Sequence, residues 1–494
     1  MMRLGSCRAD VTSDTGEEHF MTRSRRTARF ASLVLTAGLL VVACGGDSDE
    51  SSGTTSGNGT TNDTTATSGD PAAEKQVVSV AYNSTGSFPE PDATLKAAET
   101  AFEAANPGVD VELISITASD DDYHTKMQLQ LQAGDDVADV MYFSPNWVDA
   151  DAAAGYLAPL DDALAAWPDW EAQFPEAVRS GSVSADGSTY MVPWSSNDIG
   201  IWYNKDVFKK AGLPVPWEPK SWEDLTAAAE AIKANVPDAI PMHLYAGKAS
   251  GITDAILKTF QPLMYGTDDV LYDTATSKWQ PAEKGFLDAM TFISDSYSAE
   301  LTAPTQDVLN AQIWSYIGPW MKDTQLGFVL DGNWMSFAWL PGGQYEWPEW
   351  SDVLGITAIP TQSGGAAGKV TMGLRGPGLV RAAKSDSPEL AQKFIEFAVG
   401  VEHSLSFSVN SSQLAVRNDV AAMPEYTDRP TVGDFTALLQ YAHYIPLTEQ
   451  NGKVEVLLAG IIEDVALGKK SPEEAVAKYN DEMPATVGAE HYAG

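Results

Sequence analysis

The distribution of apolar and polar residues beyond residue 75 predicts alternating strands and helices. Residues 77–82 (VVSVAY) form an apolar run typical of a buried strand, and residues 109–116 alternate between apolar and polar positions. Residues 93–105 and 125–133 carry apolar side chains at helical spacing, and residues 138–143 form a third apolar run. This order, β-α-β-α-β, predicts a parallel sheet covered by helices.

Later elements are marked by capping residues at their starts. Ser471 and Glu474 form a capping-box pattern, in which each side chain binds the other's backbone N–H, and Ser221 and Ser387 also precede helical patterns. The expected helices are residues 222–234, residues 389–399 and a last helix after Ser471, and the expected short strands are residues 356–359 and 378–381.

The first 43 residues read as a signal peptide. Arginines precede an apolar run at residues 33–43, which is too short to span a bilayer because a membrane helix needs about 20 residues. Cys44 follows this run directly, as in the lipobox of bacterial lipoproteins, and is the expected lipid attachment site. Met21 is an alternative start, since residues 1–20 do not resemble a signal peptide.

Residues 44–75 are expected to be a lipidated cysteine followed by a disordered tether. The segment is rich in Gly, Ser, Thr and Asp and has almost no large apolar side chain. Such a composition buries too little surface to offset the entropy lost on ordering. A tether of this kind lets a folded part remain near a membrane and still move.

Chain length and cysteine content limit the remaining part. Roughly 420 residues follow the tether, which is too many for one ordinary core, so two lobes are expected. The chain has two cysteines, and Cys7 lies before Cys44 in the expected leader, so no internal disulfide is expected. Six histidines without metal-ligand spacing argue against a metal site, and no cofactor is expected.

Charge and aromatic content point to a class of ligand. The chain has 68 acidic and 31 basic residues, a net charge of −37, which disfavours nucleic acid as a partner. Its fourteen tryptophans are unusually many, and six of them fall between residues 314 and 350. Flat aromatic rings stack on the C–H faces of sugar rings, so a neutral sugar is a natural candidate ligand.

The first candidate binding residues follow from the predicted parallel sheet. Open α/β sheets bind ligands beyond the carboxyl ends of their strands. The predicted strand at residues 77–82 ends at Tyr82 and Asn83, and the strand at residues 138–143 leads to Asn146 and Trp147. These four residues are therefore predicted ligand contacts.

Several sequence blocks, taken in order, resemble the family 1 extracellular solute-binding proteins of bacterial ABC importers, the class that includes maltose-binding protein. No block is specific alone, but their order over some 400 residues is. The blocks are FEAANPGV at residues 102–109, AGYLAPLD at 154–161, YMVP at 190–193, IWYNKD at 201–206, SWEDL at 221–225, GFVLDGNW at 327–334 and SPELAQKFI at 387–395.

The resemblance implies an α/β fold of two periplasmic-binding-protein-like lobes, each a mainly parallel sheet flanked by helices. The lobes are joined by hinge segments near Pro193, Gly355 and Val401, with ligand in the cleft between them. The N-terminal lobe is then expected at residues 76–193 plus 355–402, and the C-terminal lobe at residues 194–354 plus 403–494.

Five further residues are predicted to contact ligand. A polyhydroxylated ligand needs aromatic plates for its apolar faces and polar side chains at its edges. Trp194, Asn197 and Asp198 follow the first expected hinge, Trp334 ends the GFVLDGNW block, and Arg375 lies between glycines.

One departure concerns the ligand. In maltose-binding protein a C-terminal helix offers aromatic residues to the sugar, whereas residues 453–456 here are Lys, Val, Glu and Val. The resemblance therefore does not point to a maltodextrin.

The implied function is capture of a sugar or oligosaccharide outside the cytoplasm and its delivery to ABC-transporter permease subunits. The protein is expected to be a monomer, to be held at the cell membrane through lipid alone, and not to be an enzyme. Two alternatives stay open: a secreted carbohydrate-active hydrolase, although no G-x-S-x-G motif is present, and a surface sensor of the same fold.

Overall fold

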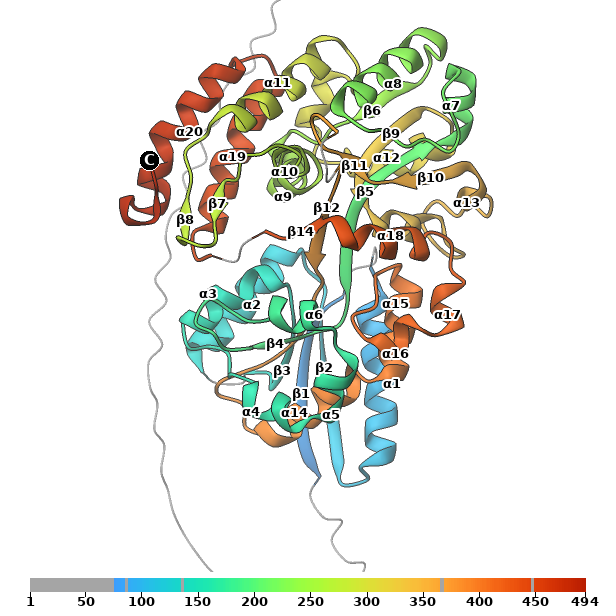
Figure 1. Cartoon of the computed structure of the whole chain (residues 1–494). Helices are drawn as coiled ribbons and strands as arrows, with labels where there is room; N and C mark the ends of the chain where they lie inside the picture. Colours follow the sequence, from blue (N-terminus) through green and yellow to red (C-terminus); the bar gives the residue numbers. More distant parts are fainter. Residues whose placement is uncertain (1–74, 85–87, 135–136, 365–367, 446–447) are drawn as a thin grey trace, which may run out of the picture. The chain divides into compact units, whose positions relative to one another are not determined.

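The structure is a computed structural model that describes residues 75–84, 88–134, 137–364, 368–445 and 448–494. The expected signal peptide, the lipid attachment site Cys44 and nearly all of the tether lie outside the described residues. The described residues belong to one compact unit, Asp70–Gly494, which contains two large sheets covered by helices (Figure 1). We call each sheet with its covering helices a lobe.

The first lobe is built on a five-stranded sheet of order β2-β1-β3-β13-β4. Its strands are β1 (Gln76–Asn83), β2 (Val109–Ile116), β3 (Val140–Phe143), β4 (Met191–Pro193) and β13 (Gly378–Arg381). The helices that cover it or follow it in the chain are α1 (Glu90–Ala105), α2 (Asp120–Ala133), α3 (Pro145–Ala153), α4 (Asp161–Ala166), α5 (Pro168–Gln173), α6 (Glu176–Gly181), α14 (Pro388–Ala398), α15 (Val401–Ser411), α16 (Asn418–Ala421) and α17 (Pro424–Thr427).

The second lobe is built on a sheet of order β11-β12-β5-β9-β6, with β10 also paired to β5 and β14 to β12. Its strands are β5 (Ser196–Asn204), β6 (Ile240–His243), β9 (Leu326–Gly332), β10 (Leu354–Thr357), β11 (Ile359–Pro360), β12 (Lys369–Arg375) and β14 (Ala442–His443), and β7 (Tyr272–Asp273) and β8 (Lys278–Trp279) form a separate hairpin. Its main helices are α7 (Lys205–Ala211), α8 (Trp222–Asn235), α9 (Ile252–Ala255), α10 (Gln261–Tyr265), α11 (Lys284–Ser298), α12 (Trp314–Lys322), α13 (Trp350–Val353), α18 (Val432–Leu438), α19 (Asn451–Ala466) and α20 (Pro472–Val487). Shorter turns are η1 (Lys248–Ser250), the π-helical η2 (Ile256–Phe260), η3 (Thr305–Leu309), η4 (Asn333–Trp339), η5 (Leu439–Tyr441) and η6 (Ala489–His491).

The α/β prediction is confirmed, but the two sheets differ in strand direction. β1 runs parallel to β2 and β3, as expected from the β-α-β-α-β pattern. In the second sheet, β5 runs antiparallel to β9, β10 and β12, and only the β6–β9 and β12–β14 pairs are parallel. The expectation of a mainly parallel sheet is therefore not met in the second lobe. β5 carries the chain into this lobe and β12 carries it back, so the two neighbouring strands run in opposite directions.

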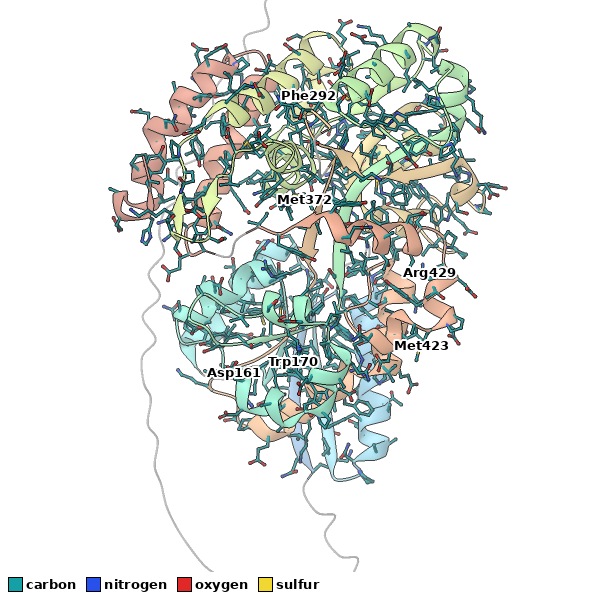
Figure 2. The ribbon with its side chains drawn as sticks, in the orientation of Figure 1. Asp161, Trp170, Phe292, Met372, Met423 and Arg429 are labelled. Atoms are coloured by element: carbon teal, nitrogen blue, oxygen red, sulfur yellow. The ribbon has the colours of Figure 1, made fainter. Side chains whose placement is uncertain are left out.

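Side chains alternate between the two faces along a strand, and each sheet has an apolar cluster on both of its faces. On β5, Ile199 and Ile201 enter one apolar cluster and Trp202 enters the cluster on the opposite face. Figure 2 shows side chains filling both lobes, with Trp170 packed against the first-lobe core and Met372 in the second-lobe core.

Three crossing segments join the lobes. The first runs from β4 into β5 and the second from β12 into β13 (Figure 1). The third follows α15, where Leu414 exchanges two backbone hydrogen bonds of 2.9 Å with Ser196. The first crossing lies between Pro193, where β4 ends, and Ser196, where β5 begins.

The other two crossings differ from the expected boundaries. β10 begins at Leu354 and pairs with β5, and β12 continues this sheet to Arg375, so the chain leaves the second lobe about 20 residues later than expected near Gly355. Val401 begins α15, which packs on α1 of the first lobe. The third crossing therefore follows Ser411 and does not lie at Val401.

Candidate functional site

The candidate site lies at the edge of the second sheet where β6 and β9 end. These strands are parallel, so their carboxyl ends lie at the same edge, which is where open α/β sheets place ligands. β6 ends at His243 and leads to Tyr245, and β9 ends at Asp331 and Gly332. Trp334 follows in η4.

The ring of Trp334 lies back over the end of β9. A Cβ atom added to Gly332 would lie 2.2 Å from this ring, so only glycine leaves the indole room in this position. The indole packs partly against the second-lobe core and stays partly exposed. Such a ring has an apolar face on which a sugar can stack.

A buried ion cluster lies beside Trp334. The ammonium of Lys258 is 3.1 Å from Asp331 Oδ1 and 3.2 Å from Asp254 Oδ1, and it lies 4.4 Å from the ring centre of Tyr245 and 5.5 Å from that of Trp334. The Tyr245 hydroxyl donates to Asp331 Oδ2 at 2.7 Å. We call these five residues the strand-end cluster.

The charges in this cluster support one another. Burial alone lowers the pKa of Lys258, but the carboxylates of Asp254 and Asp331 more than offset this, so its pKa lies above the ordinary value. Burial raises the pKa of Asp254, and Lys258 opposes that effect. Burial and the nearby Asp331 hold the pKa of Tyr245 well above its usual range, so its hydroxyl stays protonated.

His243 lies behind the cluster as a neutral ring. It is 3% exposed, and its ring centre is 4.6 Å from that of Tyr245. Burial, with the nearby Lys258, lowers the pKa of His243 to about 3. Neither ring nitrogen has a hydrogen-bond partner among the described residues. His243 therefore adds no positive charge near neutral pH.

Asn333 joins the strand-end cluster to the crossing segments. Its Oδ1 accepts from the backbone N–H of Asp198 at 2.8 Å, and its Nδ2 donates to Asn197 Oδ1 at 3.0 Å and to the Ser412 carbonyl at 2.7 Å. One buried side chain, next to Trp334 in sequence, thus binds both the first and the third crossing segment.

Asn197 and Asp198, both predicted contacts, lie inside this crossing network and are buried. Asp198 is fully buried, its Oδ1 accepts from the Ile199 backbone N–H at 3.1 Å, and its Oδ2 has no partner among the described residues. Burial raises the pKa of Asp198 to about 7.

Trp194 and Arg375 lie at the first and second crossings. The indole of Trp194 is fully buried and stacks on Phe407 of α15, with ring centres 4.7 Å apart, so it presents no surface to a ligand in this conformation. The guanidinium of Arg375 donates to the carbonyls of Gly181 and Ile445, the latter at 3.2 Å, and lies over the Tyr444 ring. Arg375 thus ties the end of α6 to the segment that follows β14.

The four predicted contacts of the first lobe are not equivalent. Tyr82 is fully buried and its hydroxyl donates to Asp92 Oδ1 at 2.7 Å, so it serves the core. Asn83 Nδ2 donates to Asp120 Oδ1 at 2.8 Å, and its own Oδ1 has no partner among the described residues. Asn146 is exposed at the start of α3.

Trp147 is the first-lobe aromatic ring closest to the predicted role. It is partly exposed and stacks on His124, with ring centres 4.4 Å apart and ring planes 6° apart. His124 Nε2 lies 2.7 Å from Asp151 Oδ2, which fixes the imidazole under the indole. Within the described residues, the hydrogen bonds and ring contacts of Asn83 and Trp147 all join first-lobe residues.

Sequence reasoning missed five members of the site, which are Tyr245, Asp254, Lys258, Asp331 and Asn333. Asp331 and Asn333 flank Gly332 inside the GFVLDGNW block, so the block itself was the available signal. Lys258 follows Asp254 by four residues, but such pairs are common on exposed helices and carry no sign of burial.

Two negative findings bear on the chemistry. Among the described residues, no three His, Cys, Asp or Glu side chains are grouped so as to hold a metal ion. Within the same part of the chain, no helix combines the length and apolar character needed to span a bilayer.

The site consists of an aromatic plate, hydrogen-bonding oxygens and one shared ammonium, which is an arrangement suited to binding a polar ring.

The fold and this site define a class: the chain belongs to the bacterial extracellular solute-binding protein family, whose pattern it matches over residues 85–404. A binding protein of Brucella abortus (strain 2308) is 26% identical over 379 residues, covering 76% of this chain and 84% of that one. The multiple sugar-binding protein of Streptococcus mutans is 31% identical over 147 residues, covering 29% of this chain and 32% of that one.

The fold is also that of a solved binding protein. The GacH receptor of Streptomyces glaucescens, solved unliganded and in complex with acarbose, superposes with a TM-score of 0.70 at 23% identity. The match covers 85% of this chain and all of that one. The two-lobed α/β architecture expected from the sequence is confirmed.

Proposed function

We propose that this protein is the substrate-binding lipoprotein of an ABC importer and that it captures a sugar or oligosaccharide between its lobes. The proposal assigns it no catalytic role. Ligand would be held outside the cytoplasm and released to the permease subunits. Membership of the solute-binding family supports the transport role, and the sugar is inferred from the site.

The observation that carries the proposal is the position of Trp334 at the carboxyl edge of the second sheet. Its indole offers an apolar face, while Asp254 of the strand-end cluster offers a carboxylate oxygen for a hydroxyl group. Two similar proteins support a sugar ligand, since one is a multiple sugar-binding protein and another was solved in complex with acarbose.

The proposed mechanism is closure of the lobes on ligand. A ligand that touches both lobes favours the closed state by its extra contacts there. The first lobe would contribute Trp147 and Asn83, whose Oδ1 is free to accept among the described residues. Asn333 would couple ligand binding at Trp334 to the crossing segments, because it adjoins Trp334 and binds Asn197 and Ser412.

The test is a thermal-shift screen of neutral mono- and oligosaccharides, followed by calorimetry on those that raise the melting temperature. A ligand present at 100 times its dissociation constant adds about 2.7 kcal/mol to stability. Trp334→Ala should weaken binding tenfold or more, because the stacking face is lost. Trp170→Ala, on α5 of the first lobe, is the matched control and should leave affinity unchanged. If no sugar binds, the proposal fails, and if sugar is cleaved, the hydrolase alternative replaces it.

Lipid anchoring at Cys44 needs its own test. Cells that express the full chain should yield a membrane-bound form carrying a diacylglyceryl cysteine, which mass spectrometry of the N-terminal peptide detects. Cys44→Ser should abolish the modification and release the protein. Retention of Cys44→Ser at the membrane would argue against the anchor while leaving sugar binding in place.

A further inference from the structure

Lys258 occupies an unusual backbone position. The helix that carries it begins as α9, passes through the π-helical turn η2 at Ile256–Phe260 and continues as α10. Single π-turns within helices are rare and are frequent at functional sites, because the extra residue redirects a side chain. Here the side chain of Lys258 is only 9% exposed and reaches the end of β9.

The contacts of Lys258 occupy most of the hydrogen-bonding capacity of the neighbouring carboxylates. Its ammonium has three protons, and it contacts Asp254 Oδ1 at 3.2 Å and Asp331 at 3.1 and 3.3 Å. Asp331 also accepts from the Tyr245 hydroxyl and from the Gly332 backbone N–H, both at 2.7 Å. Asp331 is thus fully engaged. Asp254 uses only Oδ1 among the described contacts and is 25% exposed.

The sum of these charges is negative. One ammonium is shared by two carboxylates, Tyr245 is protonated, and His243 is neutral, so the formal charge of the strand-end cluster is −1. α19 also packs against η2, but its Glu463 pairs with the exposed Lys248 at 3.5 Å. No described ion pair brings a second cation to Asp254 or Asp331.

We propose that Lys258 is a positioning residue that fixes Asp331 and the Trp334 ring, and that the net negative cluster selects neutral sugars over phosphorylated or carboxylated ones. This rests on the proposed function and names the ligand class of the same site. Asp254 Oδ2 is the oxygen left to accept from a ligand hydroxyl. Within the described part of the cluster the one ammonium is already shared by Asp254 and Asp331, so an anionic ligand would be repelled by the Asp254 carboxylate.

The role of Lys258 is tested by Lys258→Met. This variant leaves Asp254 and Asp331 facing each other without a cation, so one of them should take up a proton at mildly acidic pH. We expect calorimetric affinity for the neutral sugar found in the screen to fall at least tenfold at pH 7.5 and to recover partly at pH 5.5. The wild type should show a flatter profile over this range. Lys248→Met, which removes an exposed lysine, is the matched control.

A second variant guards against misfolding. Lys258→Met/Asp254→Asn removes one cation and one carboxylate, so the net charge returns to −1. It should fold at pH 7.5 with no acid-dependent recovery of affinity, and a profile like that of Lys258→Met alone would overturn the charge argument. An unchanged affinity and pH profile in Lys258→Met would overturn the positioning role.

The ligand class is tested on the wild type with glucose 6-phosphate, galacturonic acid and sn-glycerol 3-phosphate beside glucose, galactose, maltotriose and xylobiose. We expect binding among the neutral sugars only. Tighter binding of any of the acids would overturn the charge selection. If no sugar of either kind binds, the proposed function itself fails, which separates that failure from failure of the Lys258 argument.

Discussion

Gly332 and Trp334 show how one small residue determines the shape of a site. Gly332 is fully enclosed by the indole that folds back on it, and a side chain there would occupy the space of the ring. A motif of glycine followed by tryptophan is visible in the sequence, but the reason for the glycine becomes clear only from the structure. The position of the Trp334 ring thus depends on the lack of a side chain at residue 332.

Gly332→Ala is therefore expected to displace the Trp334 ring. The added methyl group should cost about 1–3 kcal/mol of stability, as in other overpacked sites, and should weaken sugar binding. Thermal unfolding and calorimetry measure both effects. Gly433→Ala is the control, because a Cβ atom on that α18 glycine meets nothing within 4 Å. A Gly332→Ala protein with wild-type affinity would show that the ring position does not matter for binding.

Asp198 should make stability depend on pH. Its pKa is about 7 in the folded protein against an ordinary 3.8, so the folded state holds this proton more tightly than the unfolded state. Stability is then greatest at low pH for this group and falls as pH rises from about 4 towards 7, by about 1.4 kcal/mol for each pH unit.

Asp198→Asn removes that titration while keeping an oxygen for the Ile199 N–H. Urea unfolding of both proteins at several pH values is the measurement. The variant should gain stability relative to the wild type as pH rises from 4 to 7, with the difference levelling above 7. A difference that does not change with pH would mean that Asp198 is not the responsible carboxyl group.

At the residue scale, the sequence does not reveal which candidate side chains are buried. Trp334 was predicted and lies at the strand end, whereas Trp194 was predicted on the same aromatic logic and is stacked in the core on Phe407. Both are tryptophans next to polar residues, so composition alone cannot separate them. Lys258 was not predicted because a π-turn and two carboxylates from the fold, one of them distant in sequence, determine its environment.

At the scale of elements, the serine motifs in the sequence correctly locate the starts of helices, but the serine side chain does not always form a capping hydrogen bond. Ser471 and Glu474 form both bonds of the expected capping box, at 3.2 and 2.8 Å, and α20 begins at Pro472. Ser221 precedes α8 as expected, yet its side chain makes no capping bond. A helix-start motif thus locates a helix even where its hydroxyl is not used.

This contrast gives a paired prediction. Ser471→Ala should lower stability by about 1 kcal/mol, because an N-terminal backbone N–H of α20 loses its acceptor. The melting temperature should fall by about 2–4 °C, the shift typical for lobes of this size. Ser221→Ala should have a clearly smaller effect. Equal losses in the two variants would contradict the capping explanation.

Strand topology was predictable only in part. The first three strands and the strand at Gly378–Arg381 follow from local apolar runs, and the structure confirms all four. The expected strand at residues 356–359 is divided between β10 and β11 at Ala358. Its lobe was misassigned because pairing of Ile356 with Trp202 is set by a partner about 150 residues away, which no local pattern reveals.

For the whole molecule, three crossing segments define the freedom of movement. Leu414 bonds to Ser196, and the Gly376 N–H donates to the Ser195 carbonyl at 3.1 Å, so all three crossings are joined to each other. A closing motion has to occur around this joined region, and the expected result of ligand binding is a smaller radius of gyration.

Small-angle scattering with and without the sugar found in the screen measures that change. Compaction should occur in the wild type and should be reduced in Trp334→Ala at the same sugar concentration. Trp170→Ala should compact as the wild type does. An unchanged scattering curve at saturating sugar would contradict lobe closure.

The position of β13 has a consequence for how the chain is made. β13 lies between β3 and β4 in the first sheet, yet β3 ends at Phe143 and β13 begins only at Gly378. The chain is synthesised from its N-terminus, so the edge of β3 that pairs with β13 has unpaired backbone N–H and C=O groups until most of the chain has been made. Such open strand edges can pair with strands of other chains. A fragment that ends before Gly378 would therefore leave this edge of β3 without its partner strand, and we expect such a fragment to aggregate more readily than the full chain.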